Sequence, residues 1–265
     1  LIFRESQPKY SRIDIRGLLL LWGWIPLTIV ILTYLDRWSA WIIGGLTIIV
    51  ILIFMRFVNH SLRSPNPIIN VKLLTNRRFA LSMISMFFDG FMIYAGAFIL
   101  PLYLEKSLGY SALAAGLMFI PLGIIQGITS PASGYISRRL GMKTTILTGF
   151  SLMIIYLVIS TQFDNTTASW VILLSLYLRG LGNGLSYSVL NNLSLTQISH
   201  KDLAGASSIS NATRQLSGLF GIAICTLILS SQSTDYNHLV KMSFSVVLLA
   251  AIGAIIPIFF VRIKK

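Results

Sequence analysis

The chain has 265 residues, of which 55% are hydrophobic and only 11% are charged. A soluble domain carries about 25% charged residues, so this composition excludes a water-soluble globular protein and predicts a lipid bilayer as the solvent. The formal net charge of +13 would suit a nucleic-acid partner, and the placement of the charges along the chain tests that interpretation. The single cysteine, Cys225, cannot form an internal disulfide.

Eight apolar stretches are long enough to cross a bilayer as helices. A span needs roughly 20 apolar residues, because the hydrocarbon core is about 30 Å thick and every backbone polar group within it must be paired. The stretches predict an all-α integral membrane protein with eight transmembrane helices at 17–35, 40–57, 79–101, 112–133, 144–162, 169–190, 205–230 and 242–261. One connection, 56–78, is longer than the others, and its Pro65 and Pro67 exclude a continuous helix.

The basic residues orient these spans. If residues 1–16 are cytoplasmic, the outer loops hold only Arg37, Lys106 and Lys241, and the spans hold Arg179 and Arg214. All the other Lys and Arg residues then fall on the cytoplasmic side, as the positive-inside rule requires. We therefore predict a multi-pass protein of the cell membrane with both ends of the chain cytoplasmic. Basic residues scattered over several loops exclude nucleic acid as a partner.

The long connection divides the spans into two and six. We predict a cytoplasmic segment at 1–16, two extra transmembrane helices within 17–57, a cytoplasmic loop at 58–78 and a six-helix bundle at 79–265. Six spans joined by short loops are typical of the three-plus-three repeats of secondary transporters. Asp89 follows Phe79 by ten residues and Arg179 follows Ser169 by ten residues, a faint echo between the third and sixth spans.

Enzyme signatures are absent from the sequence. It contains no G-x-S-x-G, no H-E-x-x-H, no G-x-x-x-x-G-K-[ST] and no paired-cysteine metal spacing. The histidines, His60, His200 and His238, fall in predicted loops without a partner at ligand spacing, and we interpret them as solvated. We expect no enzymatic activity, no cofactor and no metal. Without a nucleotide-binding motif, any pumping draws on an ion gradient or on another subunit.

Asp89 is the residue in which we expect function to reside. It lies about 15 Å along its span and hence near the midplane, where a charge costs from ~2.5 kcal/mol to far more and marks a functional candidate. Ser82, Ser85 and Gly96 share its helical face, whereas Phe87, Phe91, Tyr94 and Phe98 lie opposite. We predict that the small, polar face turns inward and the aromatic face turns to lipid.

Arg179 is the predicted partner of Asp89, because it lies equally deep when counted from the other membrane face. An aspartate that alternates between an arginine neighbour and desolvated isolation would bind and release a proton. We therefore assign proton or substrate coupling to Asp89 and Arg179. The alternative is a fixed ion pair that holds two helices together.

Further polar residues are candidates for lining the same cavity. Arg214 is deep if its span begins at Gly205 but interfacial if residues 203–211 extend into the cytoplasm, and an interface anchor is the favoured interpretation. The candidate cavity-lining residues are Ser85, Gln126, Asn183 and Arg214.

Four stretches of the sequence resemble the fourteen-span drug:proton antiporters of the major facilitator superfamily, the EmrB/QacA type. They are "LPLYLEKSLGYSALAAGLMFIPLG" (100–123), "SGYISRRLGMKTTILTG" (133–149), "LRGLGNGLSYSVLNN" (178–192) and "GASSISNATRQLSGLFGIAI" (205–224). The resemblance implies proton-coupled efflux of lipophilic or cationic drugs across a bacterial cytoplasmic membrane. It also implies that this chain holds the two extra helices and the C-terminal bundle, and that the N-terminal six-helix half is missing.

The resemblance also implies a copy of the family's cytoplasmic loop motif. It is recognisable as Gly134, Arg139, Gly141 and Lys143 and departs from the family pattern at Arg138, where Asp is expected, and at Met142. Two alternative functions remain open at this point. One is the export of an endogenous metabolite, and the other is a transport-incompetent half that acts only as a membrane scaffold.

Overall fold

A computed structural model describes residues 14–35, 38–64, 67–196, 198–199, 201–231 and 235–261, and these ranges contain helices and turns but no strand. The predicted all-α class is confirmed. Residues 1–13 of the predicted cytoplasmic segment, together with Arg37, Pro65 and His200, lie outside the described residues. The helices are α1 (Ile15–Thr33), α2 (Ala40–Arg63), the 3-10 helix η1 (Val71–Thr75), α3 (Arg77–Lys106), α4 (Ala112–Leu117), α5 (Ile120–Leu140), α6 (Met142–Ser160), α7 (Ser169–Leu195), α8 (Leu203–Leu229) and α9 (Tyr236–Phe260).

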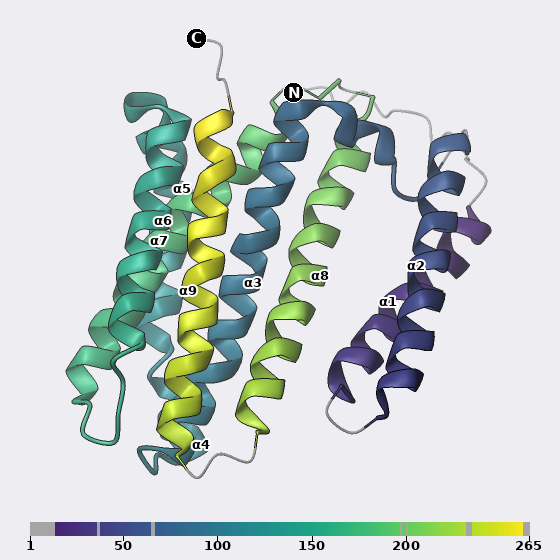
Figure 1. Ribbon diagram of the computed structural model, residues 1–265. Coiled ribbons are helices and arrows are strands. Elements are labelled where there is room, and N and C mark those ends of the chain that lie inside the picture. Colours follow the sequence, from purple (N-terminus) through teal and green to yellow (C-terminus); the bar gives the residue numbers. More distant parts are fainter. Residues whose placement is uncertain are drawn as a thin grey trace.

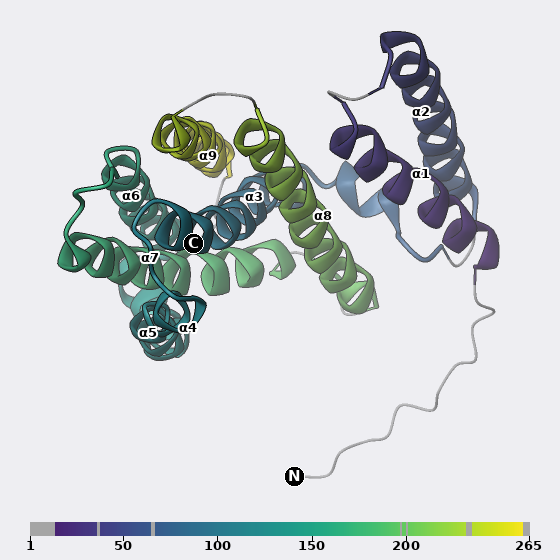
Figure 2. The same ribbon diagram turned by 90° about the horizontal axis from the view of Figure 1, so that it is seen from below.

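Seven segments among the described residues are long and apolar enough to cross a membrane: α1, α2, α3, α4 together with α5, α6, α8 and α9. The predicted sixth span, α7, has 27 residues and is thus about 40 Å long, but it does not reach the same hydropathy. It carries Arg179, Asn183 and a glycine-rich turn. The lower hydropathy fits its position, because α7 packs between α5 and α6 and faces protein on both sides (Figure 2).

The helix boundaries differ from the predicted spans most clearly in three places. Helix α2 continues past residue 57 to Arg63, into the predicted loop. The predicted span 112–133 is broken, since α4 ends at Leu117 and α5 begins at Ile120. Pro121 explains this break, because proline has no N–H to donate and its ring collides with the preceding turn. The predicted loop around residue 138 is mostly helix, with Gly141 (φ 89°) joining α5 to α6.

Helix α3 lies at the centre of the bundle and contacts α7, α8 and α9 (Figure 1). The α1–α2 hairpin stands at the edge, where α1 packs against α8 (Figure 2). Burial follows this arrangement: 61% of the apolar window of α3 is buried, against 6% in α2.

The contact between α3 and α8 depends on glycines. A methyl group at Gly90 would collide with the Ser217 hydroxyl and the Arg214 carbonyl, and one at Gly218 would collide with Tyr94. Such close approach is typical of small residues at membrane-helix interfaces. The aromatic face of α3 is therefore not turned to lipid as predicted: Phe91 is buried and Tyr94 packs on α8, because the glycines of α8 make room for these rings.

Candidate functional site

Asp89 lies in the middle of α3, and its side chain has an exposed fraction of 0%. Its Oδ2 atom is 3.4 Å from Nε of Arg214 on α8. Within the described residues, neither carboxylate oxygen accepts a hydrogen bond. Burying a carboxylate is costly unless it is paired and hydrogen-bonded, so the one ion pair with Arg214 carries the compensation for this charge.

Arg214 is held in place by aromatic rings. Its guanidinium carbon lies 3.9 Å from the ring centroid of Tyr187 on α7 and 5.9 Å from that of Tyr94 on α3. Both distances are within the range of cation–π attraction. Arg214 follows the first residue of α8, Leu203, by eleven residues, its side chain is 18% exposed, and it lies at the depth of Asp89. The interpretation of Arg214 as an interface anchor is therefore wrong.

Arg179 is not the partner of Asp89 in this structure. Its Nη2 donates a hydrogen bond of 2.7 Å to the carbonyl of Ile93, one helical turn beyond Asp89 on α3. Gly96 lies beside this contact: a methyl group there would be 3.2 Å from Oη of Tyr156 and in ordinary contact, at 3.5 Å, with the guanidinium carbon of Arg179. The Arg179 side chain is buried, and the ring of Tyr156 on α6 lies 5.6 Å from its guanidinium carbon. The predicted pairing fails because spacing along two helices does not specify how each helix is rotated.

Several other polar atoms in this region have no hydrogen-bond partner in the part of the chain that the structure describes. Folded proteins leave few buried polar atoms unpaired, and each such atom asks for an explanation. Their concentration on α3, α6 and α7, beside a buried ion pair, defines a polar cluster in an apolar bundle. The unpaired atoms are Oγ of Ser82, Ser85 and Ser186, Oδ1 of Asn183, Nη1 of Arg179 and Oη of Tyr156.

The structure brings most of the predicted residues together. Ser85 lies one turn before Asp89 on α3, and Asn183 lies one turn after Arg179 on α7. Gln126, on α5, is half-buried and makes no hydrogen bond to these side chains among the described residues. Sequence reasoning missed Tyr187 and Tyr156, because a tyrosine in an apolar span gives no signal until its neighbours are known.

The loop motif joins two helix ends. Lys143, at the start of α6, donates from Nζ to the carbonyl of Phe259 at 2.8 Å, in the last turn of α9. A cation at a helix C-terminus is favoured by the helix dipole. The guanidinium carbon of Arg139 lies 4.7 Å from the ring centroid of Tyr135, and Gly134 lies inside α5 with open space around it. The motif thus links α6 to α9 without a carboxylate.

A contact between an aspartate and a histidine joins the ends of the α1–α2 hairpin. Asp14 is the N-cap of α1: its Oδ1 accepts from the Gly17 amide at 2.9 Å and lies 2.7 Å from Nε2 of His60. Burial raises the pKa of Asp14, but the hydrogen bonds from Gly17 and His60 outweigh burial and bring the pKa below its usual value. His60 is therefore not the solvated loop residue that the sequence suggested, but part of the last turn of α2.

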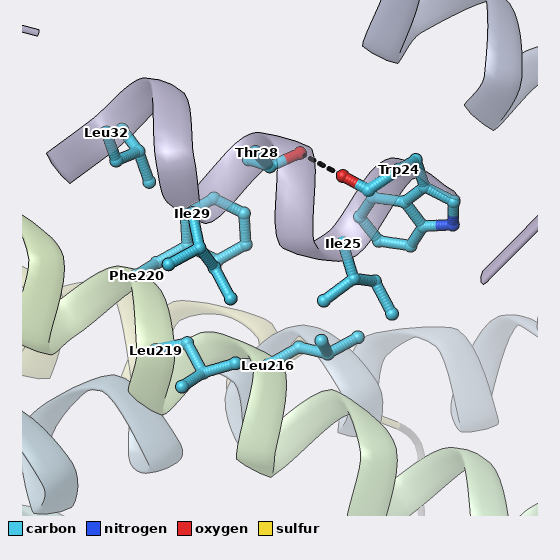
Figure 3. Close-up of a pocket in the computed structure, with 8 residues that line it drawn as sticks. All are labelled: Trp24, Ile25, Thr28, Ile29, Leu32, Leu216, Leu219 and Phe220. Carbon is cyan, nitrogen blue, oxygen red and sulfur yellow. Dashed lines mark hydrogen bonds between the residues drawn. The ribbon is translucent and has the colours of Figure 1, made fainter. Parts of the chain in front are cut away.

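An apolar groove lies where α1 meets α8, and Figure 3 shows its lining. Its one hydroxyl, on Thr28, donates to the carbonyl of Trp24 at 2.7 Å, so its hydrogen is already used within α1. The groove marks the attachment of the hairpin to the bundle and holds no charge. It is lined by Trp24, Ile25, Thr28, Ile29, Leu32, Leu216, Leu219 and Phe220.

Long apolar helices around a buried, charged cluster define an integral membrane protein of the solute-transporter class. The sequence model of the Major Facilitator Superfamily matches residues 22–222, well over half of the chain. The chain belongs to the Major Facilitator Superfamily. The resemblance seen in the sequence is confirmed, and the family is one of transporters and not an enzyme class.

Curated relatives include proteins named for drug export. The chain is 28% identical over 243 residues to the multidrug export protein EmrB of Escherichia coli strain K12, covering 88% of this chain and 46% of EmrB. It is 28% identical over 180 residues to the lincomycin resistance protein LmrB of Listeria innocua, covering 68% and 38%. It is 27% identical over 199 residues to the uncharacterized transporter YhcA of Bacillus subtilis, covering 75% and 37%. The chain spans less than half the length of these relatives.

Proposed function

We propose that this chain is the C-terminal portion of a proton-coupled exporter of lipophilic or cationic drugs in a bacterial cell membrane. The observation that carries the proposal is the fully buried carboxylate of Asp89. The cost of burying its charge is offset by one ion pair, of 3.4 Å, to Arg214 on another helix. Intramembrane acids of this kind mark proton and ion pathways. The names of EmrB and LmrB, which refer to multidrug export and lincomycin resistance, support a drug as the cargo.

Asp89 is the proton carrier in this mechanism. When it is ionised, it attracts Arg214 and holds α8 against α3; when it is protonated, the attraction is lost. Arg214 keeps its charge and its contact with the ring of Tyr187, so protonation of Asp89 weakens the attraction between α3 and α8. Because these helices touch through Gly90, a change in their attraction is transmitted to the backbone and not absorbed by flexible side chains.

Three parts of the proposal concern the whole protein. The α1–α2 hairpin is the extra pair of helices, residues 79–265 form the C-terminal bundle, and an N-terminal six-helix half completes the transporter. The proposal also places both ends of this chain in the cytoplasm. It is supported by basic residues that lie together near the end of α9, since Arg77 and Arg78 line a pocket with Phe259 and Lys143 binds the Phe259 carbonyl. Arg179 completes the coupling site by binding the backbone of α3 beside Asp89.

The test is substrate-induced proton release from the full-length protein in detergent or liposomes. We expect Asp89→Asn to bind substrate but to lose proton release and uphill export, whereas Asp202→Asn, on the loop before α8, leaves both intact. Proton release and export at the wild-type level in Asp89→Asn would contradict the coupling role. The charge reversal Asp89→Arg with Arg214→Asp tests the alternative that the two residues form only a fixed structural pair. Restored stability together with restored transport would favour that alternative.

A second candidate function, export of an anionic endogenous metabolite, is favoured by the charge of the cluster. Two guanidinium groups, of Arg179 and Arg214, stand beside one carboxylate. Nη1 of Arg179 and Oη of Tyr156 are hydrogen-bond donors without an acceptor among the described residues. A carboxylate accepts readily from such groups.

Transport of lipophilic carboxylates and lipophilic cations by the full-length protein separates the two candidates. If the metabolite is anionic, Arg179→Gln lowers carboxylate export while cation export persists, and Tyr156→Phe has a smaller effect in the same direction. Equal loss of both substrates would instead assign Arg179 to coupling. If the purified full-length protein transports neither class, the scaffold alternative is favoured.

A further inference from the structure

Four polar residues share one face at the end of α2. Arg56, Asn59, His60 and Arg63 line a shallow pocket. Their spacing of three, four and seven residues from Arg56 places them on one side of the helix. Arg56, Asn59 and Arg63 are exposed, whereas His60 is half-buried against Asp14. Helix α2, which carries this pocket, lies at the edge of the molecule, apart from α3 with Asp89 (Figure 1).

The position of Arg56 along α2 places it at the edge of the hydrocarbon. Trp41, at the opposite end of α2, is 91% exposed and suits the membrane interface. Fifteen residues separate it from Arg56, which corresponds to roughly 22 Å of helix and is less than the ~30 Å hydrocarbon core. The side chain of Arg56 must therefore extend outward to the headgroups, beside the exposed apolar side chains of Leu52 and Met55.

Neither Arg56 nor Arg63 is within ion-pair distance of a carboxylate in the part of the chain that the structure describes. Asp14, the acid in the part of the hairpin that the structure describes, is bound through Oδ1 to the Gly17 amide and His60. The helix dipole favours a basic residue in the last turn, which accounts for Arg63. It does not account for Arg56, which lies two turns earlier on the same face.

We propose that this face of α2 binds the headgroup phosphate of an anionic phospholipid in the cytoplasmic leaflet. Arg56 and Arg63 donate charge-assisted hydrogen bonds to the phosphate oxygens, and the amide of Asn59 donates a third. The acyl chains lie along the apolar surface of α2, of which only 6% is buried by protein. The site is independent of the coupling role of Asp89, and it makes the hairpin a lipid-binding element of the protein.

Native mass spectrometry of the full-length protein tests the proposal. The protein is exchanged into detergent containing phosphatidylglycerol or phosphatidylcholine, and retained lipid is counted for the wild type and for the Arg56→Gln/Arg63→Gln variant. Each basic residue near the surface contributes about 1 kcal/mol toward an anionic lipid. We expect the double variant to retain phosphatidylglycerol at least ~10-fold less well, with no change for phosphatidylcholine.

The matched control is Arg138→Gln/Arg139→Gln, which removes two exposed arginines from the end of α5, where Arg139 already stacks on Tyr135. It should retain phosphatidylglycerol as the wild type does. Inorganic phosphate at millimolar concentration should not displace the lipid. Unchanged retention in the Arg56/Arg63 variant, an equal loss in the control, or complete displacement by free phosphate would each overturn the proposal. Thermal melting of both variants shows that the losses do not come from unfolding.

Discussion

Helices α3 and α2 are both long enough to cross a membrane, but they are surrounded by different neighbours. Protein covers 61% of the apolar window of α3 and 6% of that of α2. The middle of the buried helix is the more polar of the two, since α3 carries Asp89, Ser82 and Ser85, whereas the middle of α2 is almost purely apolar. In a membrane the lipid-facing surface must be apolar, and the protein interior is where polar groups find partners. Polarity within a span therefore indicates the inside.

The largest effect should come from separating the buried charges of α3 and α8. Arg214→Met leaves the Asp89 carboxylate without its ion pair, and removing one partner of a buried pair costs about 3–5 kcal/mol. Unfolding of the full-length protein in mixed micelles measures the change in the free energy of unfolding. Arg56→Met on α2 is the matched control and should cost less than about 1 kcal/mol. An equal loss in both would mean that Asp89 and Arg214 do not interact in the membrane.

A smaller loss is expected when the α3–α8 contact is forced apart. In Gly90→Ala the added methyl group meets the Ser217 hydroxyl and the Arg214 carbonyl, so the helices must shift at a cost of about 1–3 kcal/mol. The control is Gly127→Ala on α5, where nothing lies within 4 Å of the added carbon. Thermal melting should show a lower midpoint for the first variant only. If Gly90→Ala melts like the wild type, α3 and α8 are farther apart than described.

The N-cap of α1 should contribute about 0.5–2 kcal/mol to the hairpin, as helix N-caps do. The pKa of Asp14 is lower in the folded protein than its ordinary value, so the ionised form is the stabilising one. Its contribution is complete above the ordinary value of about 3.9 and is lost as the pH falls through the lowered folded pKa. In Asp14→Asn, α1 should lose less stability as the pH falls than it does in the wild type. Hydrogen exchange of α1 followed against pH measures this difference. An unchanged pH profile would show that Asp14 is not ionised and paired.

The smallest effect should come from the lipid-facing surface of α2. Leu52→Ala removes a side chain that is 58% exposed on α2 and that we expect to face lipid, so the change in the free energy of unfolding should stay within about 0.5 kcal/mol. Met86→Ala, on the buried face of α3, should cost about 2–5 kcal/mol because it leaves a cavity. Unfolding in mixed micelles compares the two directly. A large loss for Leu52→Ala would show that a protein surface, and not lipid, covers this side of α2.

The helix breaks and ends show how far local chemistry predicts structure. The sequence predicts one span over 112–133, but α4 and α5 divide it next to Pro121, a local signal that the predicted span did not use. Gly141, with a φ of 89°, makes the tight link between α5 and α6. The extension of α2 to Arg63 had no local signal that could separate it from a loop, because its residues are polar in either case. This extension contains His60, which contacts Asp14, a residue 46 positions away in the sequence.

The sequence alone determined the all-α membrane class, the apolar spans and the inward direction of Asp89, because the bilayer imposes length, polarity and charge rules that act on each segment separately. Only the tertiary structure decided that Arg214, and not Arg179, faces Asp89. That choice depends on the rotation of α8 against α3, which is set by the close contact of Gly90 and Gly218 with the opposite helix. Such contacts join residues more than one hundred positions apart, and no pattern within a single span reveals them.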